Sequence, residues 1–147
     1  MQVKFETVRK NLGSSFAVRE KKARRFKGTY HFHPEIELTE IVSGSGTRLL
    51  GDDMSDFQEG DLVLIGSNLP HRYVNDDAAK VVSHARVIQF SPDFLGQQFL
   101  DAAEMAGLRR LVKDSARGLH FTETVVDRAH SLIDQLFAVT GLPKLIQ

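Results

Sequence analysis

The chain contains no cysteine in 147 residues. This absence excludes a disulfide framework and thiolate-based zinc or iron–sulfur sites, and it fits a reducing compartment. The chain also lacks an excess of either charge, because 19 lysines and arginines balance 19 aspartates and glutamates. A domain that grips a nucleic-acid backbone over much of its surface is usually basic, so these residues are not themselves predicted to bind DNA.

Long hydrophobic runs are missing as well. No stretch approaches the roughly 18 apolar residues of a membrane span, and the start of the chain, MQVKFETVRKN, has no signal-peptide core. We therefore expect a cytoplasmic protein with no membrane partner. Hydrophobic residues make up 41% and charged residues 26% of the chain, a balance typical of one globular domain and not of intrinsic disorder.

Residues 14–90 alternate short β-type runs with turn residues. Glycine, asparagine and aspartate separate the runs, and these residues tolerate the backbone angles of tight hairpins. Eight short strands at near-regular spacing are typical of an antiparallel sandwich or barrel. The expected strands are 15–22, 27–33, 37–43, 47–51, 54–58, 61–65, 71–75 and 81–90.

The hydrophobic period changes from residue 91 onward. Ser91 and Pro92 are typical of a helix start, and apolar residues then recur at helical spacing over residues 95–112. Thr122 is predicted to cap a further helix that ends at Gly141. We therefore expect an N-terminal arm (1–13), a β domain (14–90) and an appendage of two or three helices (91–147).

The strongest local signal is the pair His31 and His33, followed by Glu37. Side chains two residues apart on a strand point to the same face, so the two imidazoles aim together. Glu37 keeps the even spacing after a bend at Pro34, and His71 follows a second glycine-framed segment. Three imidazoles and a carboxylate suit a divalent transition metal such as Zn, Ni, Fe or Mn. The alternative is a metal-free polar patch that binds hydroxyl or carboxylate groups.

Strand parity adds four candidate ligand-binding residues. Tyr73 and Asn75 share a strand face with His71, so the Tyr73 hydroxyl is expected to point inward. His84 and Arg86 share one face of the last strand, where they could meet an anionic molecule. An exposed strand face is the alternative for Arg86.

A basic run, Arg19–Lys27, holds six cations in nine positions. Such a run is typical of a phosphate-contacting patch, or of the solvated face of an edge strand where lysines discourage unwanted pairing. Acidic residues elsewhere in the chain cancel its net field and favour the second interpretation.

Two segments resemble the sequence motifs of the cupin superfamily. Residues 28–44 resemble the first motif, G-x5-HxH-x3,4-E-x6-G, although Gly28 stands only three residues before His31. Residues 60–75 resemble the second motif, G-x5-PxG-x2-H-x3-N, without its first proline and with a longer loop. The stretches 33–76 and 90–122 are further similar to the N-terminal sensor domain of AraC-type transcription regulators and to the helical segment that follows it.

The resemblance implies a mainly β fold, namely a cupin double-stranded β-helix (jelly-roll) barrel over residues 14–90 with an effector pocket. The helices after the barrel often mediate dimerisation in that family, so a homodimer is expected. The cupin metal positions map onto His31, His33, Glu37 and His71. The family also carries a C-terminal pair of helix-turn-helix motifs that binds DNA, and we expect this chain to stop before it.

Two classes of function follow. The leading hypothesis is a regulatory domain without enzymatic activity, which binds a small-molecule effector in the barrel and thereby biases dimer or interdomain geometry. The alternative is a metal-dependent cupin enzyme, an isomerase or a dioxygenase, with the metal as Lewis acid or oxygen-binding centre. Such an enzyme would need a general base, for which His84 and Glu35 are the candidates.

Overall fold

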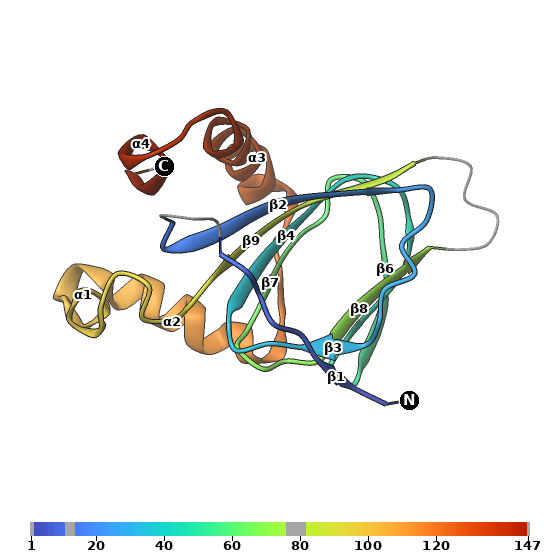
Figure 1. Ribbon diagram of the computed structural model, residues 1–147, viewed down its shortest axis with the longest axis horizontal. Coiled ribbons are helices and arrows are strands. Elements are labelled where there is room, and N and C mark those ends of the chain that lie inside the picture. The colour runs from blue at the N-terminus through green and yellow to red at the C-terminus, as the bar shows by residue number, and fades with distance from the viewer. Residues whose placement is uncertain (1, 11–13, 76–81, 147) are drawn as a thin grey trace.

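Two five-stranded sheets face each other and form the wall of a barrel (Figure 1). The structure, a computed structural model, describes residues 2–10, 14–75 and 82–146. In one sheet the strand order is β1 (Lys4–Phe5), β3 (His31–Phe32), β8 (His71–Asn75), β5 (Gly46–Leu50) and β6 (Asp53–Phe57). In the other sheet it is β10 (Leu119–His120), β7 (Leu62–Ile65), β4 (Ile36–Ser43), β9 (Ser83–Phe90) and β2 (Phe16–Ala23).

The mainly β jelly-roll architecture expected from the sequence is confirmed. Each of the eight expected strands overlaps one observed strand, and the pairing between neighbours is antiparallel throughout the barrel. Residue 81, where the last strand was expected to begin, lies outside the described residues, as do residues 1 and 11–13 of the expected arm. The two further strands are short: β1 pairs in parallel with β3, and β10 pairs with β7.

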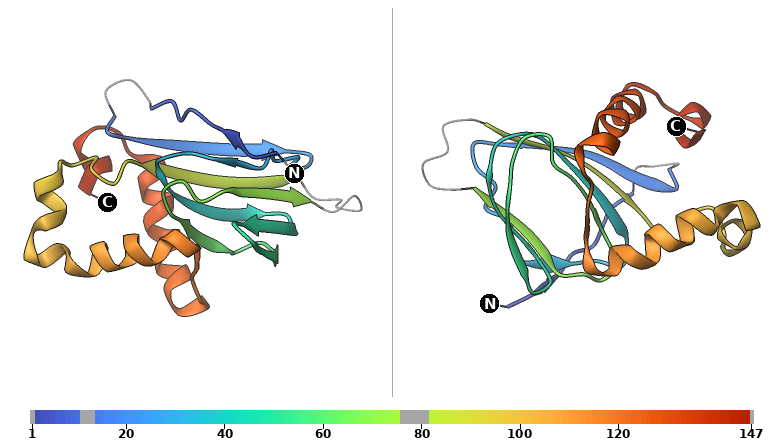
Figure 2. Two further views of the ribbon diagram at one scale, coloured as in Figure 1. Left: turned by 90° about the horizontal axis from the view of Figure 1, so that it is seen from below. Right: turned by 180° about the vertical axis from the view of Figure 1, so that it is seen from behind.

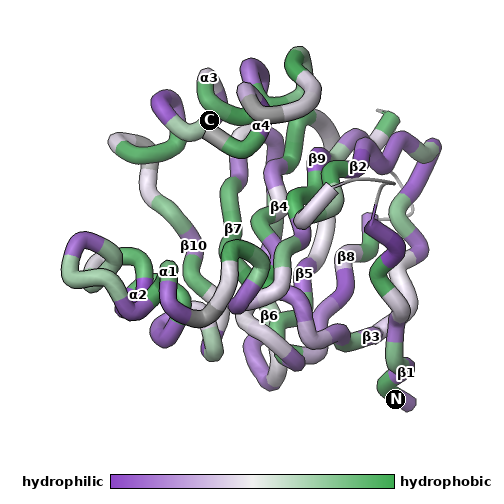
Figure 3. The backbone as a smooth tube through the Cα atoms, turned by 60° about the vertical axis from the view of Figure 1, so that its left-hand side comes forward, coloured by the Kyte–Doolittle hydropathy of each residue, from purple (hydrophilic) through white to green (hydrophobic). Residues whose placement is uncertain are grey.

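The second sheet is covered on both faces. All four residues of β7 are buried, and the strand is hydrophobic along its whole length (Figure 3). Val63 and Ile65 pack inside the barrel with Leu50, whereas Leu62 packs outside against Val126 and Ile133 of helix α3. A strand with two covered faces carries a continuous apolar run and loses the alternation of a half-exposed strand.

The helices all follow the barrel and lie on one side of it (Figures 1 and 2). They are α1 (Gln97–Asp101), α2 (Ala106–Asp114), α3 (Glu123–Ala138) and α4 (Leu142–Ile146), with short 3-10 turns at Ala103–Met105 and Ser115–Arg117. Thr122 is the N-cap residue of α3, as predicted, and the helix ends shortly before Gly141. The predicted helix start at Ser91 is wrong, because α1 begins only at Gln97 after a turn region. Among the described helices none is both long enough and apolar enough to cross a membrane.

Candidate functional site

Three histidines from separate parts of the chain come together inside the barrel. His31 on β3 and His71 on β8 are direct register partners, and their ring centroids lie 4.3 Å apart. His33 follows β3, and its ring centroid lies 5.1 Å from that of His71. The candidate ligand nitrogens of the three side chains all lie within 4.8 Å of one another. The structure therefore brings together all three histidines that the sequence assigns to one site.

Glu37 joins this group from β4. Its carboxylate is buried, with Oε2 3.2 Å from Nε2 of His33 and Oε1 3.7 Å from Nε2 of His71. The Thr39 hydroxyl donates a hydrogen bond to Oε1 over 2.7 Å, and the Gln89 amide donates one to Oε2 over 2.8 Å. The fourth predicted ligand is thus held in place by two neighbours on β4 and β9.

Backbone carbonyls orient the three imidazoles. Each ring places Nδ1 within hydrogen-bond distance of a carbonyl oxygen, so donation from Nδ1–H leaves the Nε2 lone pair for another partner. The acceptors of His31, His33 and His71 are, in that order, the carbonyls of Thr29, Glu35 and Leu69, at 2.7, 3.1 and 2.8 Å. Donor atoms that share a metal at about 2.1 Å stand roughly 3–3.4 Å apart, close to the spacing between Glu37 and His33. The residues present therefore fit a divalent transition metal.

The buried charges of this group influence one another. Burial alone would raise the pKa of Glu37, but its hydrogen bond to His33 and the charges of His71 and Lys21 lower it well below its usual range. Burial acts to lower the pKa of His33, and the hydrogen bond and charge of Glu37 outweigh it, so this pKa rises. For His71, burial dominates and lowers the pKa. Glu37 is therefore an anion at neutral pH, as a metal or cation site requires.

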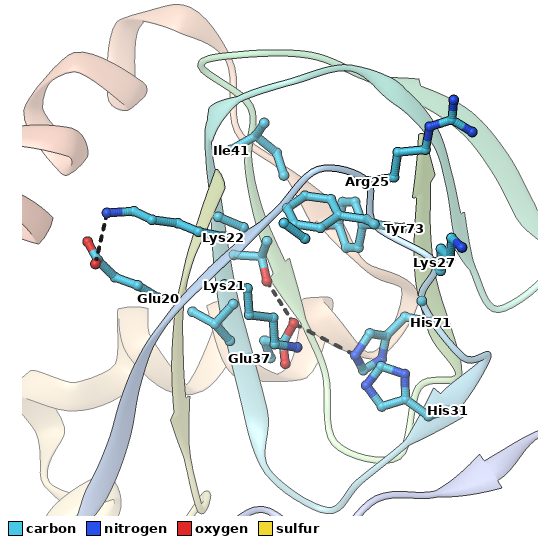
Figure 4. Close-up of a pocket in the computed structure, with 16 residues that line it drawn as sticks. Glu20, Lys21, Lys22, Arg25, Lys27, His31, Glu37, Ile41, His71 and Tyr73 are labelled. Atoms are coloured by element: carbon cyan, nitrogen blue, oxygen red, sulfur yellow. Dashed lines mark hydrogen bonds and ion pairs between the residues drawn. The ribbon is translucent and has the colours of Figure 1, made fainter. Parts of the chain in front are cut away.

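A cavity of about 470 Å³ opens beside this group. Figure 4 shows His31, His71 and Glu37 on one side of it and Tyr73 and Ile41 on another. Basic residues of β2 and of the segment after it form a further part of the lining. The complete lining is Glu20, Lys21, Lys22, Ala23, Arg25, Phe26, Lys27, Gly28, His31, Glu37, Thr39, Ile41, His71, Tyr73, Ala85 and Val87.

Tyr73 and Asn75 of β8 were both predicted to bind the ligand, but only Tyr73 lies at the cavity. Tyr73 lines the cavity, and burial raises the pKa of its hydroxyl above the ordinary value, so the group stays protonated and can donate a hydrogen bond. Asn75 is buried but bonded to backbone: its Oδ1 accepts from the amide of Phe26, and its Nδ2 donates to the carbonyl of Ser45 over 2.7 Å. Asn75 therefore fixes the chain beside the cavity and does not line it.

His84 and Arg86 do not reach the cavity. Along β9 the side chains of Ala85 and Val87 face the barrel interior, so His84 and Arg86 project from the opposite face of the sheet. There Arg86 pairs with Asp134 of α3 and His84 lies 3.5 Å from Glu20. The pocket positions predicted for these two residues are corrected accordingly. The cause is parity, since residues one apart on a strand face opposite sides.

Three residues that contact the site escaped the sequence reasoning. Thr39 and Gln89 bind the Glu37 carboxylate, and Glu6 of the N-terminal arm places Oε2 3.0 Å from Nε2 of His31. A signal for two of them was present: Thr39 stands two residues after Glu37 on the same strand, and Gln89 continues the inward face of Ala85. Nothing in the sequence near Glu6 indicates its contact.

A second hollow, of about 770 Å³, lies outside the barrel between α3 and the β6–β7 turn. Its lining is mostly polar and includes Asp61, His120 and His130. His120 lies 3.3 Å from Asp61, whose carboxylate also binds Arg48. Asp61, one of three acids that line this hollow with Glu59 and Asp127, is thus already paired.

The comparisons with known proteins agree with the barrel fold. The sequence model of the AraC-like ligand binding domain matches residues 14–146. No curated protein sequence matches the chain significantly.

Among solved structures, ToxT from Vibrio cholerae O395, bound to (E)-4-(8-methylnaphthalen-1-yl)but-3-enoic acid, aligns with a TM-score of 0.57 at 12% identity, over 90% of this chain and 52% of ToxT. A Cupin 2 conserved barrel domain protein from Salinispora arenicola CNS-205 gives 0.49 at 14% identity, over 60% of this chain and 74% of that one. The plu4264 protein from Photorhabdus luminescens gives 0.48 at 21% identity, with 62% and 77% covered. The likeness to ToxT concerns the fold, and this chain spans about half of the ToxT length.

Proposed function

The chain belongs to the AraC-like ligand-binding domain family, and from this premise we propose that it senses a small-molecule effector on behalf of a transcription regulator. The observation that carries the proposal is the barrel cavity of about 470 Å³. Apolar side chains form much of its wall, and His31, His71, Glu37 and Tyr73 supply polar groups. Convergent polar groups in an apolar cavity are typical of small-ligand sites. ToxT, which shares this fold, was solved with a carboxylic acid bound.

The path from the cavity to the helices runs through the second sheet. Ala85 and Val87 line the cavity, and Arg86 between them contacts Asp134 of α3 from the other face. An effector that moves β9 would therefore also move the contact of this strand with α3. A ligand shifts such an equilibrium only through its different affinity for the two arrangements, typically by about 1–3 kcal/mol.

Dimerisation through the C-terminal helices is part of the same proposal. Val125 and Leu132 of α3 are 50% and 41% exposed, and Leu145 of α4 is 42% exposed. Apolar side chains grouped on neighbouring helices favour a symmetric contact with a second copy. Contact with DNA is assigned to a separate helix-turn-helix part of the regulator.

We include a divalent transition metal in the proposed site, held by His31, His33, His71 and Glu37. The support is that Nδ1 of each imidazole lies at a backbone carbonyl, so Nε2 is the nitrogen that a metal would take in exchange for its present partner. A bound metal would act as a Lewis acid and bind an oxygen atom of the effector. Metal analysis after dialysis against Zn²⁺, Ni²⁺, Fe²⁺ and Mn²⁺ tests this part, and stoichiometric uptake that is lost in His33→Ala supports it.

The same donor set favours a metal-dependent cupin enzyme as the second candidate function. Neither residue considered as its general base lies at the cavity among the described residues. His84 projects from the outer face of β9, and Glu35 lies behind His33 with Oε2 3.7 Å from Nδ1. Uptake of metal without turnover of any substrate would leave the sensor as the function.

A thermal-shift screen of a small-molecule library, with and without chelator, tests the proposed function. Hits are expected to raise the melting temperature of the wild type and to lose most of their effect in Ala85→Leu, where the larger side chain projects into the cavity. Ala138→Leu, an exposed change at the end of α3, is the matched control and should respond like the wild type. Hits that stabilise Ala85→Leu as strongly as the wild type would contradict binding in the cavity.

A further inference from the structure

The basic run after residue 19 turns out to form one wall and the mouth of the barrel cavity. Lys21, Lys22, Arg25 and Lys27 all line it. Building on the proposed function, we infer that the effector carries a carboxylate or phosphate group, and that Lys21 and Lys27 bind this anion. The run therefore determines the specificity of the pocket, in addition to placing lysines on the edge strand β2.

The cations of this run divide by direction. Lys22 pairs with Glu20 at 3.4 Å, and Arg19 lies 3.8 Å from Glu6 and donates to the carbonyl of Arg9. Lys22 faces outward, whereas Arg19 lies on the same face as Lys21 because its register partner is Val87 of the cavity wall, and both already have partners. Lys21 points into the cavity, where its ammonium group lies beside Glu37 (Figure 4). Lys27 forms no side-chain hydrogen bond or ion pair with any residue that the structure describes.

Glu37 has hydrogen-bond partners other than Lys21. Its two oxygens already accept hydrogen bonds from Thr39 and Gln89 and lie close to His33. The charge of Lys21 adds to these contacts and lowers the pKa of Glu37 further. The lining contains four cations, Lys21, Lys22, Arg25 and Lys27, and two carboxylates, Glu20 and Glu37, so these side chains sum to a net positive charge. Such a cavity attracts an anion, because several cations gathered at one cleft raise the local concentration of anions.

The rest of the cavity defines the body of the ligand. Phe26, Ile41, Tyr73, Ala85 and Val87 supply hydrophobic surface, and Phe57 packs its ring against that of Tyr73. A hollow of about 370 Å³, lined by Arg24, Arg25 and Lys27, adjoins the mouth because it shares two lining residues with the cavity. The effector that fits this cavity has an apolar, preferably aromatic body and one anionic group, and it is small enough for a volume of about 470 Å³.

Calorimetry with matched acid and amide pairs tests the inference on the full chain. The lead pair is 4-phenylbutanoate and 4-phenylbutanamide. Phenyl phosphate and inorganic phosphate are tested as well, to distinguish binding of a phosphate group from binding of a carboxylate. The acid is expected to bind at least about tenfold more tightly than the amide, since charge-assisted hydrogen bonds exceed neutral ones. Lys21→Met should weaken the acid about tenfold and leave the amide unchanged, and Lys27→Gln should act in the same direction.

Lys113→Met, an exposed change on α2, is the matched control and should leave all affinities unchanged. Circular dichroism establishes that each variant is folded. Equal affinity for acid and amide, or an acid affinity that Lys21→Met and Lys27→Gln do not alter, would overturn the anion preference while leaving a ligand-sensing cavity in place. If no compound of either charge binds, neutral screening hits included, the proposed function fails together with the inference.

Discussion

His31 and His71 lie far apart in the sequence, yet they face each other across β3 and β8 with ring centroids 4.3 Å apart. This pairing depends on the jelly-roll topology, which places β3 beside β8 in one sheet. Glu37 reaches the same place from the opposite sheet and lies 3.7 Å from His71. The barrel thus joins side chains of both sheets into a single polar group beside its cavity.

Removing the charge of Glu37 should destabilise the protein. In Glu37→Gln an amide group would replace one oxygen, and it would then face either the donating Thr39 hydroxyl or the donating Gln89 amide. Leaving such buried donors without an acceptor typically costs about 2–4 kcal/mol. Urea denaturation at pH 7.5 measures this loss, with the exposed Glu59→Gln as control. A loss below about 0.5 kcal/mol would contradict the hydrogen-bond network around Glu37.

Arg86 is expected to hold α3 on the barrel. Its guanidinium group binds Asp134, lies 3.6 Å from the buried Glu40 and stacks 5.2 Å from the ring centre of Phe137. Arg86→Met should cost about 2 kcal/mol of unfolding free energy, because Glu40 then loses a buried partner. Arg110→Met, whose side chain is 85% exposed and pairs only with Asp114 among the described residues, should change the stability by less than about 0.5 kcal/mol.

The stability should also depend on the ionisation of Glu40. Burial raises the pKa of Glu40 above its ordinary 4.5, against the attraction of His130 and Arg86 and with some repulsion from Asp134. The folded state therefore holds this proton more tightly than the unfolded state, and the contribution of Glu40 to stability decreases as the pH rises through 4.5 and above. Glu40→Gln should be more stable than the wild type at pH 7.5, with the difference vanishing near pH 4. Urea midpoints at the two pH values measure it, and a variant that is less stable at pH 7.5 would contradict the argument.

Gly46 occupies a position that excludes any side chain. A Cβ atom there would lie 2.2 Å from the carbonyl oxygen of Val74 and 2.7 Å from Cα of Asn75. Because both are backbone atoms of β8, Gly46→Ala should separate β5 from β8 and cost about 3 kcal/mol. Gly107→Ala is the control, since no atom lies within 4 Å of its Cβ position in α2, and it should stabilise the protein by about 0.5 kcal/mol. Thermal unfolding of both variants checks the contrast.

The positions of the strands and the candidate metal ligands could be predicted from the sequence because they depend on local patterns. Turn residues separate the strands, and the even spacing of His31 and His33 fixes their shared direction. The face of β9 could not be predicted in the same way, because one side of the sheet faces the barrel interior and the other is covered by α3. Polar and apolar residues then occur on both faces. The alternation of polar and apolar residues, from which Arg86 and His84 were predicted to face the cavity, therefore does not identify the inner face of this strand.

The role of the basic run illustrates a second limit. A lysine on an edge strand protects the edge whether it points outward or inward, so composition alone does not distinguish Lys21 from Lys22. Only the register of β2 against β9, in which Lys21 is paired with Ala85 of the cavity wall, shows that Lys21 is the one on the inner face of the sheet. The contact between Glu6 and His31 likewise depends on the pairing of β1 with β3, which no local pattern indicates.

Imidazole NMR during ligand titration tests the central claim, that the barrel cavity is the effector site, most directly. The chain has six histidines, of which His31 and His71 line the cavity and His120 and His130 line the outer hollow. With a compound that raises the melting temperature, the ring signals of His31 and His71 are expected to shift while those of His120 and His130 stay in place. Shifts confined to His120 and His130 would contradict the account.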